Sequence, residues 1–162
     1  MSNHAAQSHD HDGCIETCMR AAERTCADKG LQFTPVRRRV LELLLEEHKA
    51  LGAYDILAVL RAEGLGTQPP IAYRALDFLV SHGFAHRIER LNAFIACAHT
   101  GQRHAPAFLI CRNCKRVDEA DTAPGAGELA RAAEEAHFEI EGVTREAIGL
   151  CRVCRTDNEA RA

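Results

Sequence analysis

Two cysteine pairs of identical spacing are the residues of this chain with the clearest chemistry. Cys111 and Cys114 form one Cys-x-x-Cys pair, and Cys151 and Cys154 form the other. Two residues between the cysteines let one turn of the chain present both sulfur atoms to a single ion, and two such turns complete a tetrahedral shell of four sulfurs. The spacing therefore predicts a structural zinc site, with a redox-active dithiol as the alternative.

A looser set of metal-binding residue types lies between the first half of the chain and the first cysteine pair. His86 and Cys97 are expected on opposite strands of one hairpin, where they could face each other. A metal ion held by this set would fix the angle between the two halves of the chain. Each residue taken singly is more often a structural or exposed side chain. The remaining candidates are His99, His104 and Glu119.

A third set of side chains suits contact with nucleic acid. Arginine can pair through two hydrogen bonds with guanine, and tyrosine can contact phosphate or the methyl group of thymine. Ordinary surface side chains on helices are the other interpretation. The candidates are Arg37, Tyr54, Tyr73 and Arg74.

The elements expected around these residues form a helix-turn-helix followed by a hairpin. Thr34 is a good N-cap and Pro35 suits the first helical position, so a helix is expected to begin there. Helix, turn, helix and hairpin together make up a winged helix, whose second helix, here 71–82, enters the major groove of DNA. Apolar spacing and turn residues predict further helices over 14–29 and 53–62, and strands over 84–89 and 93–98.

The rest of the chain is expected to form a small separate unit of strands and one helix. A helix over 128–137 fits between the two cysteine pairs, followed by a mostly extended segment over 138–150. Short strands are expected over 107–111 and 117–120. The fold class is therefore α+β, with a winged-helix unit followed by a small α/β unit.

Composition narrows the function. The chain has 162 residues and no apolar run near the roughly 20 residues that span a bilayer, so we expect a cytoplasmic protein without membrane contact. Eight cysteines in a reducing compartment favour metal binding over disulfides. The net charge of −3 is uneven, with 11 Lys/Arg against 9 Asp/Glu over 20–90 and 9 against 14 elsewhere. No nucleophile motif or phosphate-binding loop is present, so neither an enzyme nor a small-molecule substrate is expected.

At these residues the chain resembles the Fur family of metal-dependent repressors. The resemblance covers about 26–154 and rests on short motifs in matching order and spacing. The run 73–79 and Cys97 are similar to the zinc-sensing branch of that family. The matching motifs are Thr34-Pro35-Val36-Arg37, Ala53-Tyr54-Asp55-Ile56-Leu57, Pro70-Ile71-Ala72-Tyr73-Arg74-Ala75-Leu76, Gly83-Phe84 with His86, Cys111 with Cys114, and Gly149-Leu150-Cys151 with Cys154.

The resemblance implies a zinc-responsive repressor of zinc uptake genes, which binds double-stranded operator DNA as a homodimer. It also implies two zinc ions per chain. The structural ion maps onto Cys111, Cys114, Cys151 and Cys154, and the regulatory ion onto His86, Cys97, His104 and Glu119. His99 competes with His104, which we prefer because its spacing to Cys111 matches the branch.

The resemblance and the elements together predict five segments. They are a disordered His-rich tail (1–13), a winged-helix DNA-binding domain (14–98), a hinge (99–106), a dimerisation and metal-binding domain (107–156) and a second tail (157–162). An iron- or peroxide-sensing member of the same family is the main alternative function. A zinc-ribbon interaction module and a Cys-x-x-Cys thiol-disulfide enzyme are the others.

Overall fold

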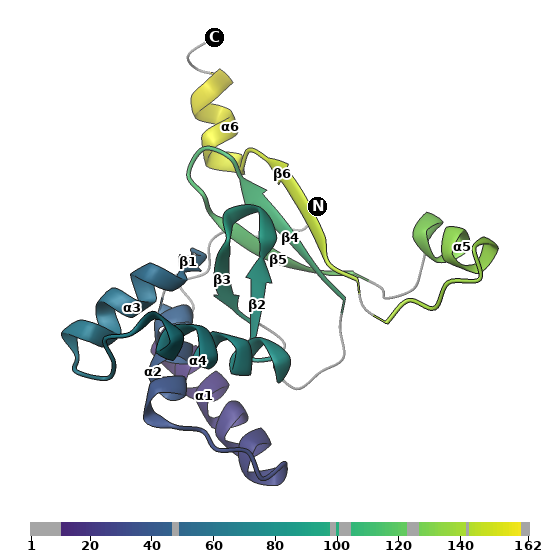
Figure 1. Cartoon of the computed structure of the whole chain (residues 1–162). Helices are drawn as coiled ribbons and strands as arrows, with labels where there is room; N and C mark the ends of the chain where they lie inside the picture. Colours follow the sequence, from purple (N-terminus) through teal and green to yellow (C-terminus); the bar gives the residue numbers. More distant parts are fainter. Residues whose placement is uncertain are drawn as a thin grey trace.

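The chain is seen here in a computed structural model, which describes residues 11–46, 49–97, 100, 105–122, 127–141 and 143–159. His99, His104, most of the predicted hinge and residues 1–10 of the predicted tail lie outside this part. The described residues form a helical unit with a small sheet and a second unit built on another sheet (Figure 1). The predicted α+β class with an N-terminal winged helix is confirmed. Within the described residues, no helix is long and apolar enough to cross a membrane.

The first unit has the element order predicted for a winged helix. Its three-stranded sheet has the order β1-β3-β2, in which β2 and β3 form the hairpin that we call the wing. Helix α3 spans the predicted residues, α4 begins two residues earlier than predicted, and α1 three residues earlier. The elements are α1 (His11–Asp28), α2 (Pro35–Glu46), β1 (Leu51–Gly52), α3 (Ala53–Ala62), α4 (Pro69–Ser81), β2 (Ala85–Ile88) and β3 (Ala93–Ala96).

Helix α2 begins at the predicted residue, and α4 begins at a pair of prolines. The amide of Arg37 donates to Oγ1 of Thr34 at 3.4 Å, which caps α2, and prolines occupy the first two positions of α4. Gly83 follows α4 with a φ of 75°, a conformation that lets the chain turn at once into the wing. The buried face of α4 consists of Ala72, Ala75, Leu76 and Leu79.

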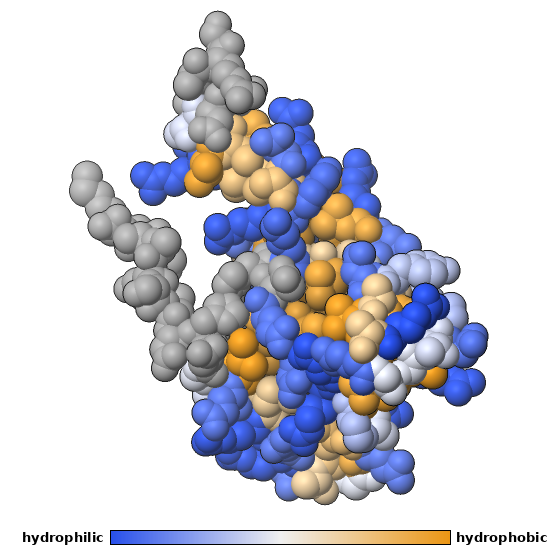
Figure 2. Space-filling view, turned by 90° about the vertical axis from the view of Figure 1, so that its left-hand side faces the viewer, coloured by the Kyte–Doolittle hydropathy of each residue, from blue (hydrophilic) through white to orange (hydrophobic). Residues whose placement is uncertain are grey.

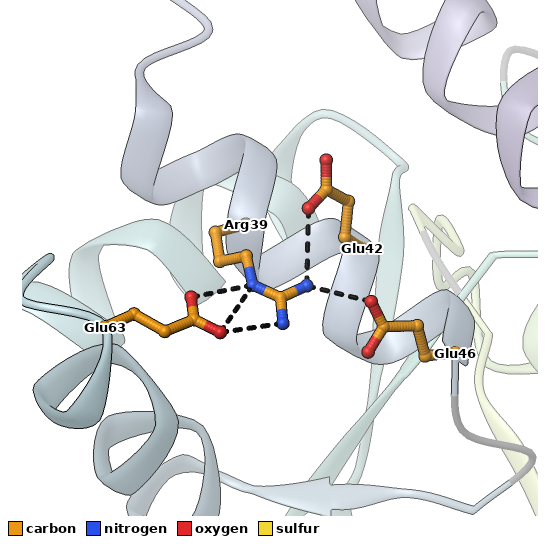
Figure 3. A network of polar contacts seen from close by, with 4 residues as sticks. All are labelled: Arg39, Glu42, Glu46 and Glu63. Atoms are coloured by element: carbon orange, nitrogen blue, oxygen red, sulfur yellow. Dashed lines mark hydrogen bonds and ion pairs between the residues drawn. The ribbon is translucent and has the colours of Figure 1, made fainter.

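One arginine ties α2 to the end of α3. The Nε and Nη2 atoms of Arg39 donate to the carboxylate of Glu63, which follows the last residue of α3. Its Nη1 atom donates to Glu46 at 2.8 Å and to Glu42 at 3.3 Å (Figure 3). These carboxylates hold the pKa of the Arg39 guanidinium above its usual range, first by accepting its hydrogen bonds at Glu63 and Glu46. One cation thus binds three carboxylates, two on α2 and one just after α3.

The second unit is organised around a strand with a different partner on each side. Strand β4 pairs antiparallel with β5 and parallel with β6, which gives the order β5-β4-β6. Of the extended segment predicted over 138–150, only β6 is a strand, and α6 was not predicted at all. The elements are β4 (Ala105–Cys111), β5 (Val117–Thr122), α5 (Glu128–Glu135), β6 (Arg145–Gly149) and α6 (Arg152–Glu159).

Two apolar clusters hold these elements together. The larger lies among the helices of the first unit and includes the fully buried Phe84. The smaller joins the wing to the second sheet, and we call it the apolar joint. Burial of a side chain as large as Phe108 contributes about 2 kcal/mol to stability, so packing in the apolar joint stabilises the contact between the two units. The buried residues of the apolar joint are Ile88, Phe108, Ile110 and Val117.

Candidate metal centres and nucleic-acid interface

The parallel pairing of β4 and β6 brings the two cysteine pairs together. Cys111 is the last residue of β4 and stands opposite Gly149 at the end of β6, so both strands deliver their carboxyl ends to one edge. Tight turns follow, with the amide of Lys115 donating to the carbonyl of Cys111 at 3.0 Å. The four sulfur atoms lie within 4.8 Å of one another. We call Cys111, Cys114, Cys151 and Cys154 the four-sulfur cluster.

The electrostatics of the four-sulfur cluster suit a cation. Backbone amides, that of Cys151 first, lower the pKa of Cys111 to about 6. The side-chain Nδ2 of Asn113 donates to the sulfur of Cys154 at 3.3 Å and lowers its pKa, but burial and the neighbouring sulfurs outweigh it and raise that pKa to about 11. The four thiols are not joined in disulfides. Four thiolates this close need a positive ion among them, and four sulfurs are a zinc-type donor set.

A second cluster lies where the wing meets the second sheet. His86 comes from β2, Cys97 follows β3 and Glu119 comes from β5, and their ligand atoms lie within 4.8 Å of one another. We call these three residues the joint cluster. The structure thus brings together three of the four residues that the resemblance implied for a regulatory site. The fourth, His104, lies outside the described residues, as does its competitor His99.

The joint cluster is shielded from solvent. Cys97 is buried, and the side chains of His86 and Glu119 are 17% and 6% exposed, with Nε2 and Oε1 3.6 Å apart. The ring of Phe108 lies against His86, with 5.3 Å between centroids. An imidazole, a thiol and a carboxylate held together in a dry setting form a mixed nitrogen, sulfur and oxygen donor set, which fits tetrahedral Zn²⁺.

The residues predicted to contact DNA fall into two groups. Tyr54 on α3 is 70% exposed, Tyr73 on α4 is 39% exposed, and Arg74 is exposed beside it. Arg37 differs, because its guanidinium lies 3.7 Å over the ring of Phe78 and donates to the carbonyl of Gln32. Three of the four side chains therefore face solvent, while Arg37 packs α2 against α4.

Sequence reasoning missed two contacts of these sites. One is the bond from Asn113 to Cys154, which the position of Asn113 inside a Cys-x-x-Cys turn could have suggested. The other is a carboxylate of β6 that reaches the wing, Glu146. This contact joins Glu146 to an amide of the wing more than 50 positions earlier in the chain, and no local sequence pattern indicates such a contact.

The fold and the two clusters define a class of protein: a winged helix joined to a small sheet unit, with one candidate metal site in that unit and another between the two. The sequence model of the Ferric uptake regulator family matches residues 28–147. The chain belongs to this family.

Known relatives agree with that assignment. The zinc uptake regulation protein of Escherichia coli (strain K12) is 37% identical over 135 residues, which cover 82% of this chain and 78% of the relative. The solved structure of a zinc uptake regulator complexed with zinc and DNA has a TM-score of 0.81 at 35% identity, covering 90% of this chain and 97% of that one.

Two solved structures of one relative have the same sequence identity to this chain but differ in how closely their folds match it. Holo XcZur has a TM-score of 0.77 and apo XcZur a TM-score of 0.50, both at 38% identity. The matched regions are comparable, covering 86% and 88% of this chain and 98% and 99% of the relative. The arrangement described here is therefore closer to the holo structure.

Proposed function

We propose that this chain is a zinc-responsive transcriptional repressor, which binds operator DNA as a homodimer when its regulatory zinc site is filled and controls zinc uptake genes. The observation that carries the proposal is the joint cluster, because it gathers zinc-type ligands from both units at the place where they meet. The likeness to a zinc uptake regulator bound to zinc and DNA supports the same function.

We assign two zinc ions to each chain. The four-sulfur cluster holds a structural ion that joins the ends of β4 and β6 to the start of α6. The joint cluster, with His104 as fourth ligand, holds the regulatory ion. Zinc supplies at both places a divalent charge that keeps thiolates deprotonated and close together.

The regulatory step follows from where the ligands come from. His86 and Cys97 move with the wing, whereas Glu119 moves with the second sheet. The complete ligand set exists only when the two units are closed on each other, so metal binding shifts the population towards that arrangement. By linkage, operator DNA tightens zinc binding by the same factor by which zinc tightens DNA binding.

The exposed side chains of α3 and α4 are assigned to DNA. Arg74 and Tyr73 lie on the helix that enters the major groove of DNA in a winged helix, and Tyr54 reaches the phosphate backbone beside it. Arg37 acts mainly by fixing α2 to α4 through Phe78, since its guanidinium is already engaged there.

The second unit is assigned to dimerisation. Strand β6 forms one edge of its sheet, where Ile148 is 44% exposed, and Leu109 on the central strand β4 is 50% exposed on the other face. Figure 2 shows apolar side chains among hydrophilic ones over the upper part of the molecule, where this unit lies. A second copy would cover such a surface and set two recognition helices at the spacing of two half-sites.

The test is a measurement of zinc per chain paired with operator binding. The full-length dimer should contain two zinc ions per chain, and mild chelation should remove one ion per chain together with tight DNA binding. Re-addition of zinc should restore both, whereas Mn²⁺ should not at the same concentration. A dimer that keeps its structural zinc, lacks the labile ion and still binds the operator as tightly as before would refute the proposal. Restoration by Fe²⁺ but not by zinc would identify an iron sensor instead.

A further inference from the structure

A second contact between the units lies beside the joint cluster and needs no metal. The Oε1 atom of Glu146 accepts a hydrogen bond from the amide of Glu89 at 2.7 Å, and its Oε2 atom accepts one from the amide of Arg90 at 3.2 Å. Both donors belong to the short 3-10 turn Glu89–Leu91 at the tip of the wing. We call this contact the wing cap.

The wing cap supplies acceptors for two amides that have no partner within their own helical turn. The first amides of any helical turn have no acceptor inside it, so they point outward as a pair of donors. A carboxylate that receives both of them forms two charge-assisted hydrogen bonds and matches the positive end of the turn. Glu146 is thus bonded to backbone atoms, so the contact is independent of the side chains of Glu89 and Arg90.

The register of the second sheet relates the wing cap to the joint cluster. Phe108 of β4 stands opposite Glu119 of β5 on one side and opposite Glu146 of β6 on the other. Residues directly opposite in neighbouring strands project from the same face of a sheet. One row across the sheet therefore presents two carboxylates to the wing, with the buried Phe108 between them. Glu119 joins His86, and Glu146 joins the backbone three residues further along the chain.

We propose that Glu146 is a positioning residue, which holds the wing closed on the second unit without metal and thereby sets how tightly the joint cluster binds zinc. This inference rests on the proposed function. Without zinc in the joint cluster, the wing cap and the apolar joint favour the closed arrangement, together with an isolated bridge between Lys49 and Arg116. The apparent dissociation constant for zinc equals the intrinsic constant divided by the closed fraction, so every loss of closed population weakens zinc binding in proportion.

The test compares Glu146→Gln with the matched variant Glu141→Gln in the full-length dimer with its four-sulfur site filled. Both remove one carboxylate from the same part of the chain, Glu146 from β6 and Glu141 from the segment before it, where it is exposed. Glutamine keeps one acceptor oxygen but turns its other arm into a donor, which faces a backbone amide. We expect Glu146→Gln to weaken zinc binding in a chelator competition by about five- to twentyfold, the range for losing one of two charge-assisted bonds in a partly exposed setting. Glu141→Gln should change it less than twofold.

A second readout does not depend on zinc. With the four-sulfur site filled and the joint cluster empty, hydrogen exchange at the amides of Glu89 and Arg90 should be about tenfold faster in Glu146→Gln than in Glu141→Gln. Saturating zinc should restore operator affinity of Glu146→Gln to within twofold of the wild type. Unchanged exchange at these amides would overturn the proposal even if the protein senses no zinc. Weak operator binding at saturating zinc would also overturn it, because it would indicate a role in folding instead of positioning.

Discussion

Cys97 is the buried donor of the joint cluster, and its sulfur is the softest ligand there. In Cys97→Ser a hydroxyl replaces the thiolate, and a hydroxyl is a poor zinc ligand. We expect a folded dimer. Loss of a residue that only hydrogen-bonds a metal ligand lowers metal affinity by roughly 10–100-fold, so loss of the ligand Cys97 itself should lower zinc affinity by more than that. Operator binding should then be weak and insensitive to zinc. Gel-shift titrations with and without zinc measure this.

The matched control for that variant is Cys26→Ser. Cys26 is also buried, but it lies on α1 in the core of the first unit. Its substitution perturbs a core to a similar degree without touching the joint cluster. A zinc response that survives in Cys97→Ser, or that disappears in Cys26→Ser, would contradict the assignment.

Arg74 is the residue assigned to base recognition. In Arg74→Ala the binding free energy should fall by about 1–3 kcal/mol on the preferred operator, and discrimination should relax at one base position. Binding to a panel of operators with single base changes measures both effects. An equal loss on every operator would mean that Arg74 contacts only phosphate.

At the scale of elements, Arg39 shows how a surface network can position helices. Three carboxylates from α2 and the end of α3 converge on its guanidinium (Figure 3). In Arg39→Met they would face one another without the cation, so α3 should loosen from α2. We expect the melting temperature to fall by a few degrees, because each pair is partly exposed and contributes little singly. Calorimetry measures it, and operator affinity should fall in parallel.

Arg24→Met is the control, since Arg24 is an exposed cation on α1. It removes the same charge from the first unit but leaves the Arg39 network intact. If both variants melt at the same temperature, the network does not hold α3 in place.

Local signals predicted most elements, and long-range pairing decided the rest. Helix α3 lies at the predicted residues because glycines and apolar spacing mark both its ends. Helix α6 carries no apolar stripe, and its first turn is held by Cys154 in the four-sulfur cluster, so its sequence alone gave no sign of it. The two cysteine pairs were recognisable from spacing. The row Glu119, Phe108 and Glu146 was not, because the parallel partner of β4 cannot be read from the strand itself.

At the scale of the whole molecule, three kinds of side-chain contact join the two units within the described residues, beside an isolated backbone bridge between Lys49 and Arg116. They are the joint cluster, the apolar joint and the wing cap. The apolar joint and the wing cap favour the closed arrangement of the two units with or without zinc. The joint cluster favours it only when zinc is bound, and therefore to an extent that rises with the concentration of free zinc. The described arrangement, in which all three are formed, is more similar to the structure of holo XcZur than to that of apo XcZur.

The short connection at Gly83 has a consequence for how such proteins diversify. Only three residues separate the last residue of α4 from the first of β2, so we expect the helix assigned to DNA and the strand that carries His86 to move together. Yet Tyr73 and Arg74 face solvent, away from the buried ligands. Exchanging those two side chains for others should retarget the protein to new promoters while the metal that switches it, and the concentration at which it does so, stay unchanged.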